Sequence, residues 1–396
     1  MFRKLLQFIH LLPIYWTVSG LFIISKGDKI LVTLIIISLV TKLICCLFDR
    51  DESIDIQYNH MIGIVLICAI YASFSYYHNG YSSSEIRVLI STALYSVFSL
   101  PKKIRYKSLI YITAFSSIYI SYQTINIIEI QHLSRNKLPL NAIPYANYTG
   151  LLSIIALYLS YLSRNKLLSL LSFFSFILLT INVILVDTRG AWLALIVSYI
   201  TIIFIIFLRK RSLKLTLISI SLFLAVALLS YPIVESRIER TIKEVELLEE
   251  GNLDSSWGVR VQLWTAGYNI VKENPLVLGL GQTKHLKLIQ DMYKEGKLTR
   301  RIAKFDNKNF HNSIIDRTVK YGLLGLVLYL GVVLIPFIYG IINLNSNYSP
   351  LLIIMPIFIF VAGLSYVPLA HPGTYFLYLL TSILLINKIR HDRTYK

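Results

Sequence analysis

The stretch ILVDTRGAWLALI, residues 184–196, places an aspartate, a threonine and an arginine between two long apolar runs. The first run covers residues 167–186 and the second covers residues 190–208. Each run is long enough to cross a hydrocarbon core of ~30 Å as a helix, whereas the permanent charge of Arg189 is costly inside lipid. The stretch therefore predicts two membrane-spanning helices joined by a tight polar turn at the membrane surface.

The same pattern recurs along the chain. Hydrophobic residues make up 55% of the sequence and charged residues only 15%, and the mean hydropathy is +0.63. Lipid offers no partners to backbone N–H and C=O groups, so runs of this kind must be helical. We predict an all-α, polytopic membrane protein with about twelve transmembrane helices. They are expected at residues 5–25, 30–48, 61–77, 86–100, 108–128, 148–163, 167–186, 190–208, 215–234, 322–342, 351–366 and 373–386.

The net charge of +18 mainly records orientation in the membrane. Lysines and arginines gather at alternate helix ends, at residues 3–4, 102–107, 164–166, 209–214 and 388–396. This positive-inside pattern predicts that both termini are cytoplasmic, and it accounts for the basic residues without a nucleic-acid partner. Since an odd-numbered helix then ends outside, the turn that contains Arg189 is expected on the periplasmic side.

One long polar segment interrupts the apolar runs. We therefore divide the chain into residues 1–234 with transmembrane helices one to nine, residues 235–321 as a periplasmic loop domain with amphipathic helices, and residues 322–396 with helices ten to twelve and a cytoplasmic tail. Within the loop, SSWGVRVQLWTAGYNIVKENP predicts a serine-capped helix that ends at residues 274–275. Its apolar positions Val261, Trp264, Tyr268 and Val271 are expected to contact the membrane surface or the helical bundle.

Three residues on the external side are candidates for chemistry: Arg189, Arg260 in the amphipathic helix, and His311 before the tenth helix. Taken singly, they have ordinary interpretations as a boundary anchor, a solvated helix residue and a loop histidine. Together they suit one class of substrate, because arginines at a helix start bind phosphate or pyrophosphate and a histidine accepts a proton near neutral pH. The sequence carries no metal-ligand cluster, so the arginines are expected to replace a metal electrostatically.

Three blocks, DTRGAWLALI, WGVRVQLWTAGYNIVKENPLVLGLG and FHNSIIDRTVKYGLLGLVLYL, occur in this order around the external loop. Together they resemble the O-antigen ligase (WaaL) family and its O-antigen polymerase relatives. The resemblance implies a GT-C-like fold, as in glycosyltransferases that act on lipid-linked sugars, within the cell inner membrane. It also implies transfer of O-antigen polysaccharide from undecaprenyl pyrophosphate to a sugar hydroxyl of the lipid A–core, on the periplasmic face and without a cofactor. Arg189 and Arg260 would then bind the donor pyrophosphate, and His311 would activate the acceptor hydroxyl.

Neighbouring residues and the exact activity leave alternatives open. Asn312 either orients His311 or a sugar, or caps the next helix. Arg317 and Lys320 either add positive potential for the donor or anchor their helix at the membrane boundary. An O-antigen polymerase is the alternative within the same chemistry, and a flippase or exporter of lipid-linked oligosaccharides is the alternative from another class. The scarcity of cations inside the predicted bundle argues against the flippase, whose path for pyrophosphate would need them.

Overall fold

The computed structural model describes residues 2–24, 26–48, 56–101, 104, 106–210, 217, 220–221, 228, 231–273, 277–304 and 309–394. Throughout these ranges the regular structure is helical and no strand is present, which confirms the predicted all-α class for this part of the chain. The helices of the amino-terminal half are α1 (Phe2–Thr17), α2 (Gly20–Ile23), α3 (Gly27–Phe48), α4 (His60–His78), α5 (Ser83–Phe98), α6 (Tyr106–Ile125), α7 (Ala142–Leu162), α8 (Lys166–Leu185) and α9 (Arg189–Lys210). A π-helical turn, Asn126–Ile130, continues α6, and a 3-10 turn covers Arg135–Lys137.

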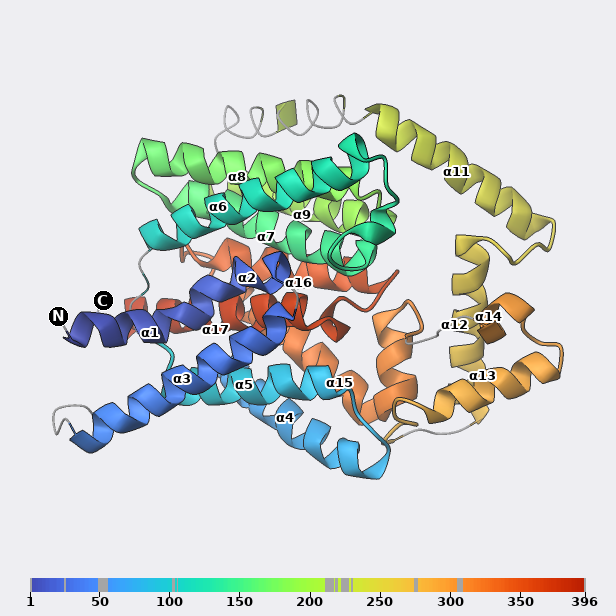
Figure 1. Cartoon of the computed structure of the whole chain (residues 1–396), viewed down its shortest axis with the longest axis horizontal. Helices are drawn as coiled ribbons and strands as arrows, with labels where there is room; N and C mark the ends of the chain where they lie inside the picture. Colours follow the sequence, from blue (N-terminus) through green and yellow to red (C-terminus); the bar gives the residue numbers. More distant parts are fainter. Residues whose placement is uncertain are drawn as a thin grey trace.

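The carboxyl-terminal half contains the external loop helices and three long helices. The loop helices are α11 (Tyr231–Glu249), α12 (Ser256–Glu273), α13 (Lys284–Lys294) and α14 (Arg300–Lys304). The long helices are α15 (Ser313–Ile342), α16 (Ser349–Gly363) and α17 (Pro372–Thr394), with a 3-10 turn at Pro368–Ala370 before the last. Figure 1 shows α11–α14 at one end of the helical bundle, while both ends of the chain lie at the other.

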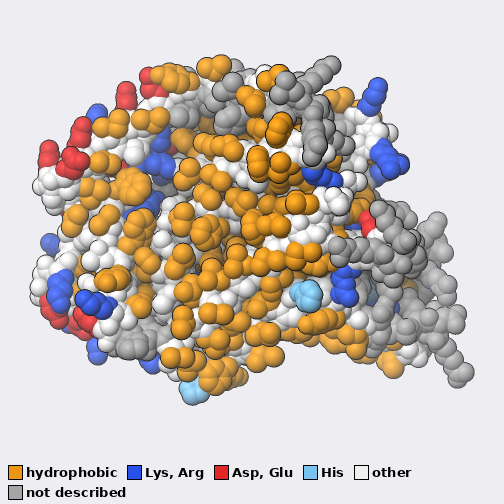
Figure 2. All heavy atoms as spheres, turned by 180° about the vertical axis from the view of Figure 1, so that it is seen from behind, with side chains coloured by type: hydrophobic (Ala, Val, Ile, Leu, Met, Phe, Trp, Pro, Cys, Tyr) orange, Lys and Arg blue, Asp and Glu red, His pale blue; other side chains and the backbone are white. Residues whose placement is uncertain are grey.

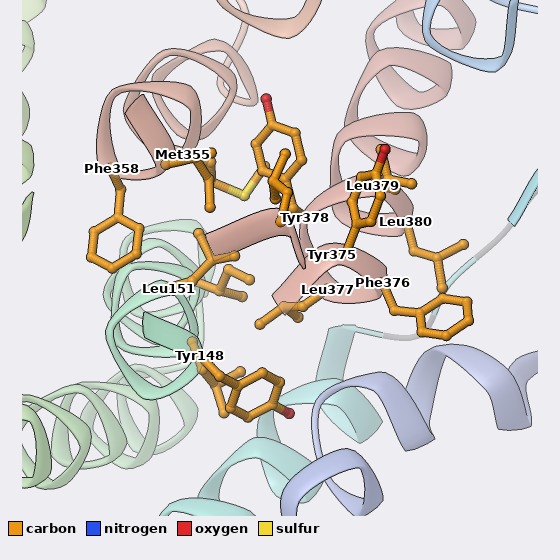
Figure 3. Close-up of a cluster of buried hydrophobic side chains, with 14 of the residues drawn as sticks. Tyr148, Leu151, Met355, Phe358, Tyr375, Phe376, Leu377, Tyr378, Leu379 and Leu380 are labelled. Atoms are coloured by element: carbon orange, nitrogen blue, oxygen red, sulfur yellow. The ribbon is translucent and has the colours of Figure 1, made fainter. Parts of the chain in front are cut away.

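Helix α7 is the centre of the bundle, because most of its side chains are buried on every face. Figure 3 shows Tyr148 and Leu151 of α7 close to residues of α16 and α17 in the largest buried apolar cluster. Gly150 permits this close packing, since a Cβ placed on it would lie 2.8 Å from the ring of Phe358 in α16. The core of the bundle is therefore built where α7, α16 and α17 meet.

Within the described residues, six helices are long and apolar enough to cross a membrane, which supports the prediction of a membrane protein. They are Gly27–Leu47, His60–His78, Ala142–Leu162, Lys166–Leu185, Arg189–Arg209 and Ser313–Ile342, and α16 is a shorter apolar helix. Apolar side chains cover the middle of the face in Figure 2, and charged side chains gather toward its two sides. Such a continuous apolar surface is unusual for a soluble protein and fits contact with lipid.

The predicted runs agree with the helices in position but differ in detail. The first run is wrong as a single helix, because the chain turns after Thr17 and α2 follows as a separate short helix. Most of the ninth run, residues 215–234, lies outside the described residues. The count of twelve spans and the division of the chain into two membrane parts and a loop stay predictions.

The tenth run was expected to begin at Gly322, but α15 begins nine residues earlier, at Ser313. Gly322 instead forms a kink within α15, with φ 70° and ψ −174°. A Cβ at this position would lie 2.2 Å from the carbonyl oxygen of Val277, and the backbone of Leu280 donates to the carbonyl of Val319 at 2.9 Å. Glycine is therefore needed where the loop segment crosses α15, both for the positive φ and for the close approach.

The loop helices have a small apolar core of their own. The expected cap of α12 is present, since the hydroxyl of Ser255 accepts from the backbone N–H of Gly258 at 3.0 Å. Of the apolar positions expected to contact the membrane surface or the bundle, Val261 and Tyr268 are exposed, whereas Val271 packs against the buried cluster of the loop helices. Contact with the membrane surface stays a prediction. The buried cluster comprises Val259, Leu263, Ala266 and Ile270 of α12, Ile289 and Met292 of α13, Leu298, Ile302 of α14, Phe310 and Val319 of α15. The small residues Gly258, Ala266 and Gly267 let the neighbouring segments approach on this side.

Candidate functional site

The turn between α8 and α9 brings two charged residues together at the end of the bundle that faces the loop helices. Asp187 has a positive φ of 54°, and the carbonyl of Thr188 accepts the first helical hydrogen bonds of α9, so that Arg189 is the first residue of this helix. A Cβ on Gly190 would lie only 2.0 Å from the hydroxyl of Ser365. Gly190 therefore lets the start of α9 contact the connection between α16 and α17.

Asp187 is surrounded by arginines from two other segments. Its carboxylate pairs with the guanidinium groups of Arg237 at 3.2 Å and Arg240 at 3.5 Å, both from α11, and lies 4.0 Å from that of Arg135. Arg135 also donates to the carbonyls of Val186 and Asp187. Burial lowers the pKa of Arg237 to about 10, although the charge of Asp187 opposes this shift. Asp187 thus holds a cluster of cations at the turn.

Arg189 makes a bidentate ion pair with Glu244 of α11. Its two terminal nitrogens donate to the two carboxylate oxygens at 3.1 and 2.7 Å. Both side chains are less than one-fifth exposed. The two parallel N–H groups of the guanidinium thus bind the two oxygens of a carboxylate, and the same arrangement can bind two oxygens of a phosphate group.

Arg260 projects from α12 toward the same region. Its guanidinium lies 5.9 Å from the centroid of the Trp257 ring, and this ring packs edge to face with Trp264. The pKa of Arg260 is lowered, first by burial and then by the neighbouring positive charge of Arg189, while Glu244 acts in the opposite sense. A partly buried cation that is repelled by its neighbour favours the binding of an anion.

His311 lies directly before α15 and has a positive φ of 51°. Its ring packs against Tyr366 with 5.7 Å between the centroids. The loop is held by Asp316, whose carboxylate accepts from the backbone N–H of Phe310 at 3.1 Å. Burial is the main reason that the pKa of His311 falls to about 4, and the charge of Arg260 lowers it further. The imidazole is therefore neutral at pH 7 and able to accept a proton.

One cavity of about 180 Å³ gathers these groups. Arg189, Arg260 and His311 all contribute to its wall, although they come from α9, α12 and the segment before α15. The complete lining is Arg135, Ile143, Asp187, Thr188, Arg189, Gly190, Arg237, Ser256, Val259, Arg260, Arg301, His311 and Ser365. Two larger cavities, of about 370 and 390 Å³, have mainly apolar linings that reach residues near Lys388 and Arg209. Among these three cavities, the arginine-lined one has a composition suited to a multiply charged anion.

Three neighbouring residues take structural positions. Asn312 caps α15, since its side-chain oxygen accepts from the backbone N–H of Ile314 at 2.9 Å. Arg317 pairs with Glu85 of α5 at 2.5 Å, and Lys320 pairs with Asp316 at 2.9 Å. The expectation that Arg317 and Lys320 anchor the helix at the lipid boundary is wrong, because both are almost fully buried in ion pairs.

Five charged residues of the site were not among the predicted site residues: Arg135, Asp187, Arg237, Glu244 and Arg301. The sequence does hold a signal for two of them. Arg237 and Glu244 are seven residues apart, which places them on the same face of a helix, together with Arg240. For Arg135 and Arg301 the sequence holds no comparable periodic signal, because each reaches the cavity from a short turn or a five-residue helix.

The comparisons with known proteins bear on this part of the chain. Residues 174–330 match a family model described as O-Antigen ligase, and this segment includes Arg189, Arg260 and His311. An uncharacterized protein of Haemophilus influenzae is 29% identical over 164 residues. That match covers 40% of this chain and 40% of the relative, so the two proteins are alike over about two-fifths of their lengths.

Proposed function

We propose that this protein transfers O-antigen polysaccharide from undecaprenyl pyrophosphate to a sugar hydroxyl of the lipid A–core, because residues 174–330 match a family model described as O-Antigen ligase. The observation that carries the proposal is the common cavity of Arg189, Arg260 and His311. A transfer site of this kind needs cations for the leaving diphosphate and a base for the acceptor, and these residues supply both. The protein would work in the inner membrane with its active site on the periplasmic face.

The arginines would hold the diphosphate of the donor. Five arginines line the cavity, namely Arg135, Arg189, Arg237, Arg260 and Arg301, whereas Asp187 is the one acidic residue in the same lining. When the glycosyl bond breaks, negative charge grows on the departing diphosphate oxygen. Guanidinium groups already oriented in a partly buried site stabilise this charge without reorganisation, which is the largest single contribution in many enzymes. Arg189 and Arg260 are proposed to make these contacts.

His311 would act as the general base. The acceptor hydroxyl oxygen forms a new bond to the anomeric carbon of the donor sugar, while the bond between that carbon and the diphosphate oxygen breaks. The electron pair of the broken bond stays on undecaprenyl pyrophosphate, and the hydroxyl proton moves to the imidazole of His311. The products are the glycosylated acceptor, the lipid diphosphate and a protonated histidine, which later releases its proton to water.

The donor itself would strengthen this base. The positive charge of Arg260 contributes to the low pKa of His311, about 4. A diphosphate bound between the arginines would offset that charge, and its own negative charge would favour the protonated imidazole. The pKa of His311 is therefore expected to rise when the donor binds, toward the range in which a histidine is an efficient base.

The test is reconstitution of the purified protein in liposomes with lipid-linked O-antigen. Transfer to added rough lipopolysaccharide supports the ligase, and transfer to a second lipid-linked chain instead would assign the protein as a polymerase. His311→Ala is expected to lower the transfer rate by about 10²–10⁴-fold, the usual contribution of a general base. His132→Ala, a change at an exposed histidine in another loop, serves as the matched control.

A normal transfer rate in the His311→Ala variant would contradict the proposed base. Movement of the lipid-linked donor across the bilayer without any glycosyl transfer would contradict the enzyme and favour the flippase. Both variants must first be shown to insert into the membrane and to bind the donor as the unmodified protein does.

A further inference from the structure

Arg189, which the proposed function assigns to the donor, is already occupied by an anion of the protein itself. Glu244 receives hydrogen bonds from both terminal nitrogens of this guanidinium, at 3.1 and 2.7 Å. A carboxylate in this position stands where a phosphate group of the donor would bind. The lipid-linked donor and Glu244 therefore compete for the same N–H groups of the Arg189 guanidinium.

Helix α11, which carries Glu244, is attached to the site mainly by charge. Arg237 and Arg240 pair with Asp187, and Glu244 pairs with Arg189. Within the described ranges, neither buried apolar cluster includes a residue of α11. Ile238 and Ile242 lie on another face of the helix and are more than half exposed. Figure 1 shows α11 as a separate helix at the upper right edge of the molecule, above α12 in this view.

These contacts make α11 easy to displace. A helix with buried apolar contacts loses their free energy when it moves away, whereas partly exposed ion pairs contribute little and can be exchanged for other charges. An anion that binds Arg189 more strongly than Glu244 does would release this end of α11 at small cost. The structure thus combines a competing internal anion with a loosely packed helix.

We propose that Glu244 is an internal counter-ion of Arg189, which the donor diphosphate displaces, and that α11 moves away from α9 when this exchange takes place. The inference rests on the proposed function, since it takes Arg189 to be a donor-binding residue. Glu244 keeps the arginine oriented and neutralised until the donor binds. A diphosphate replaces it because its oxygens can contact both Arg189 and Arg260, whereas Glu244 pairs with Arg189.

The first experiment measures the binding of inorganic pyrophosphate to the full-length protein in detergent by calorimetry. Glu244→Gln keeps the shape of the side chain and removes its charge. Pyrophosphate is therefore expected to bind this variant about 10-fold more tightly than the unmodified protein, because one partly buried competing charge is lost. Glu246→Gln makes the same change of charge at an exposed position of α11 and is expected to leave the affinity unchanged. Glu244→Ala provides a second variant with the same expectation.

The second experiment follows α11 by hydrogen exchange. Backbone amides of residues 231–249 are expected to exchange faster in the unmodified protein when pyrophosphate is added, and to exchange at this faster rate in Glu244→Gln without it. Equal or weaker pyrophosphate binding by both Glu244 variants, or unchanged exchange in α11 on binding, would overturn the inference.

Failure of the inference can be told apart from failure of the proposed donor site. If Arg189→Ala and Arg260→Ala abolish pyrophosphate binding while the Glu244 variants bind as before, only the counter-ion role is wrong. If the two arginine variants bind pyrophosphate normally, the donor site itself is wrong, and with it the basis for the exchange.

Discussion

Arg260 and His311 line the same cavity, and the positive charge of Arg260 is the largest influence after burial that lowers the pKa of His311 to about 4. Arg260, which is proposed to bind the donor, thus lowers the proton affinity of His311, which is proposed to activate the acceptor. An anion bound between Arg260 and His311 would offset the charge of Arg260 and so raise the pKa of His311. This coupling leads to the first of four predictions.

The pH dependence of transfer should differ between the free and the donor-bound protein. A protonated His311 cannot act as a base, so activity falls as the pH drops through its pKa. The acidic limb of kcat/KM, which reports the free enzyme, is expected near pH 4, and the limb of kcat is expected at a higher pH because the bound diphosphate raises the pKa. Initial rates between pH 3.5 and 8, about the range where a histidine titrates, check this. A kcat limb at or below that of kcat/KM would contradict the proposed coupling.

Arg260→Lys should impair transfer although it keeps the charge. Lysine loses the planar fork that binds two phosphate oxygens, and it also loses the stacking of the guanidinium near the Trp257 ring. We expect kcat/KM for the lipid-linked donor to fall by about 10- to 100-fold, the loss that corresponds to one or two charge-assisted hydrogen bonds. Arg300→Lys, at an exposed position of α14, is the control and should retain full activity. Near-normal transfer by Arg260→Lys would show that the residue supplies only positive potential.

The folded protein should lose stability in mild acid. The pKa values of His311 and His371 are both lowered to about 4, mainly by burial, from an ordinary value near 6.5. Between these two pH values the unfolded chain binds more protons than the folded one, so stability is full above about pH 6.5 and falls as the pH decreases toward 4. Thermal unfolding in detergent at pH 7 and pH 5 measures the effect. His371→Gln should reduce the change in Tm between these two conditions; an equal change would exclude His371 as a contributor.

Breaking the buried pair between Arg317 and Glu85 should be costly. The two side chains are 4% and 5% exposed, and they join α15 to α5 at 2.5 Å. Glu85→Gln leaves the arginine charge buried and without its ionic partner, a loss of about 3–5 kcal/mol in comparable cases. The double variant Glu85→Leu with Arg317→Met should recover much of this stability, because no unpaired charge remains. If Glu85→Gln unfolds at the same temperature as the unmodified protein, the pair does not stabilise the junction.

The sequence by itself determined the all-helical class, the membrane character and most of the helix positions. These properties depend on local length and apolar content, which a run such as residues 167–186 carries within itself. The local pattern also predicted the serine cap of α12, whereas the predicted end of the helix at residues 274–275 lies outside the described residues. It did not specify which side of this helix is buried against protein, because apolar residues occur on more than one face and the neighbouring helices select the face that is covered.

The tertiary structure alone decided which charges meet. Arg189, Arg260 and His311 were singled out from their places in the sequence, but their common cavity depends on the crossing of α9, α12 and the start of α15. Glu244 on Arg189, the arginines around Asp187, and Glu85 on Arg317 belong to pairs distant in the chain. The sequence around a charged residue does not indicate its partner, because a long-range ion pair exists only after apolar packing has brought the helices together.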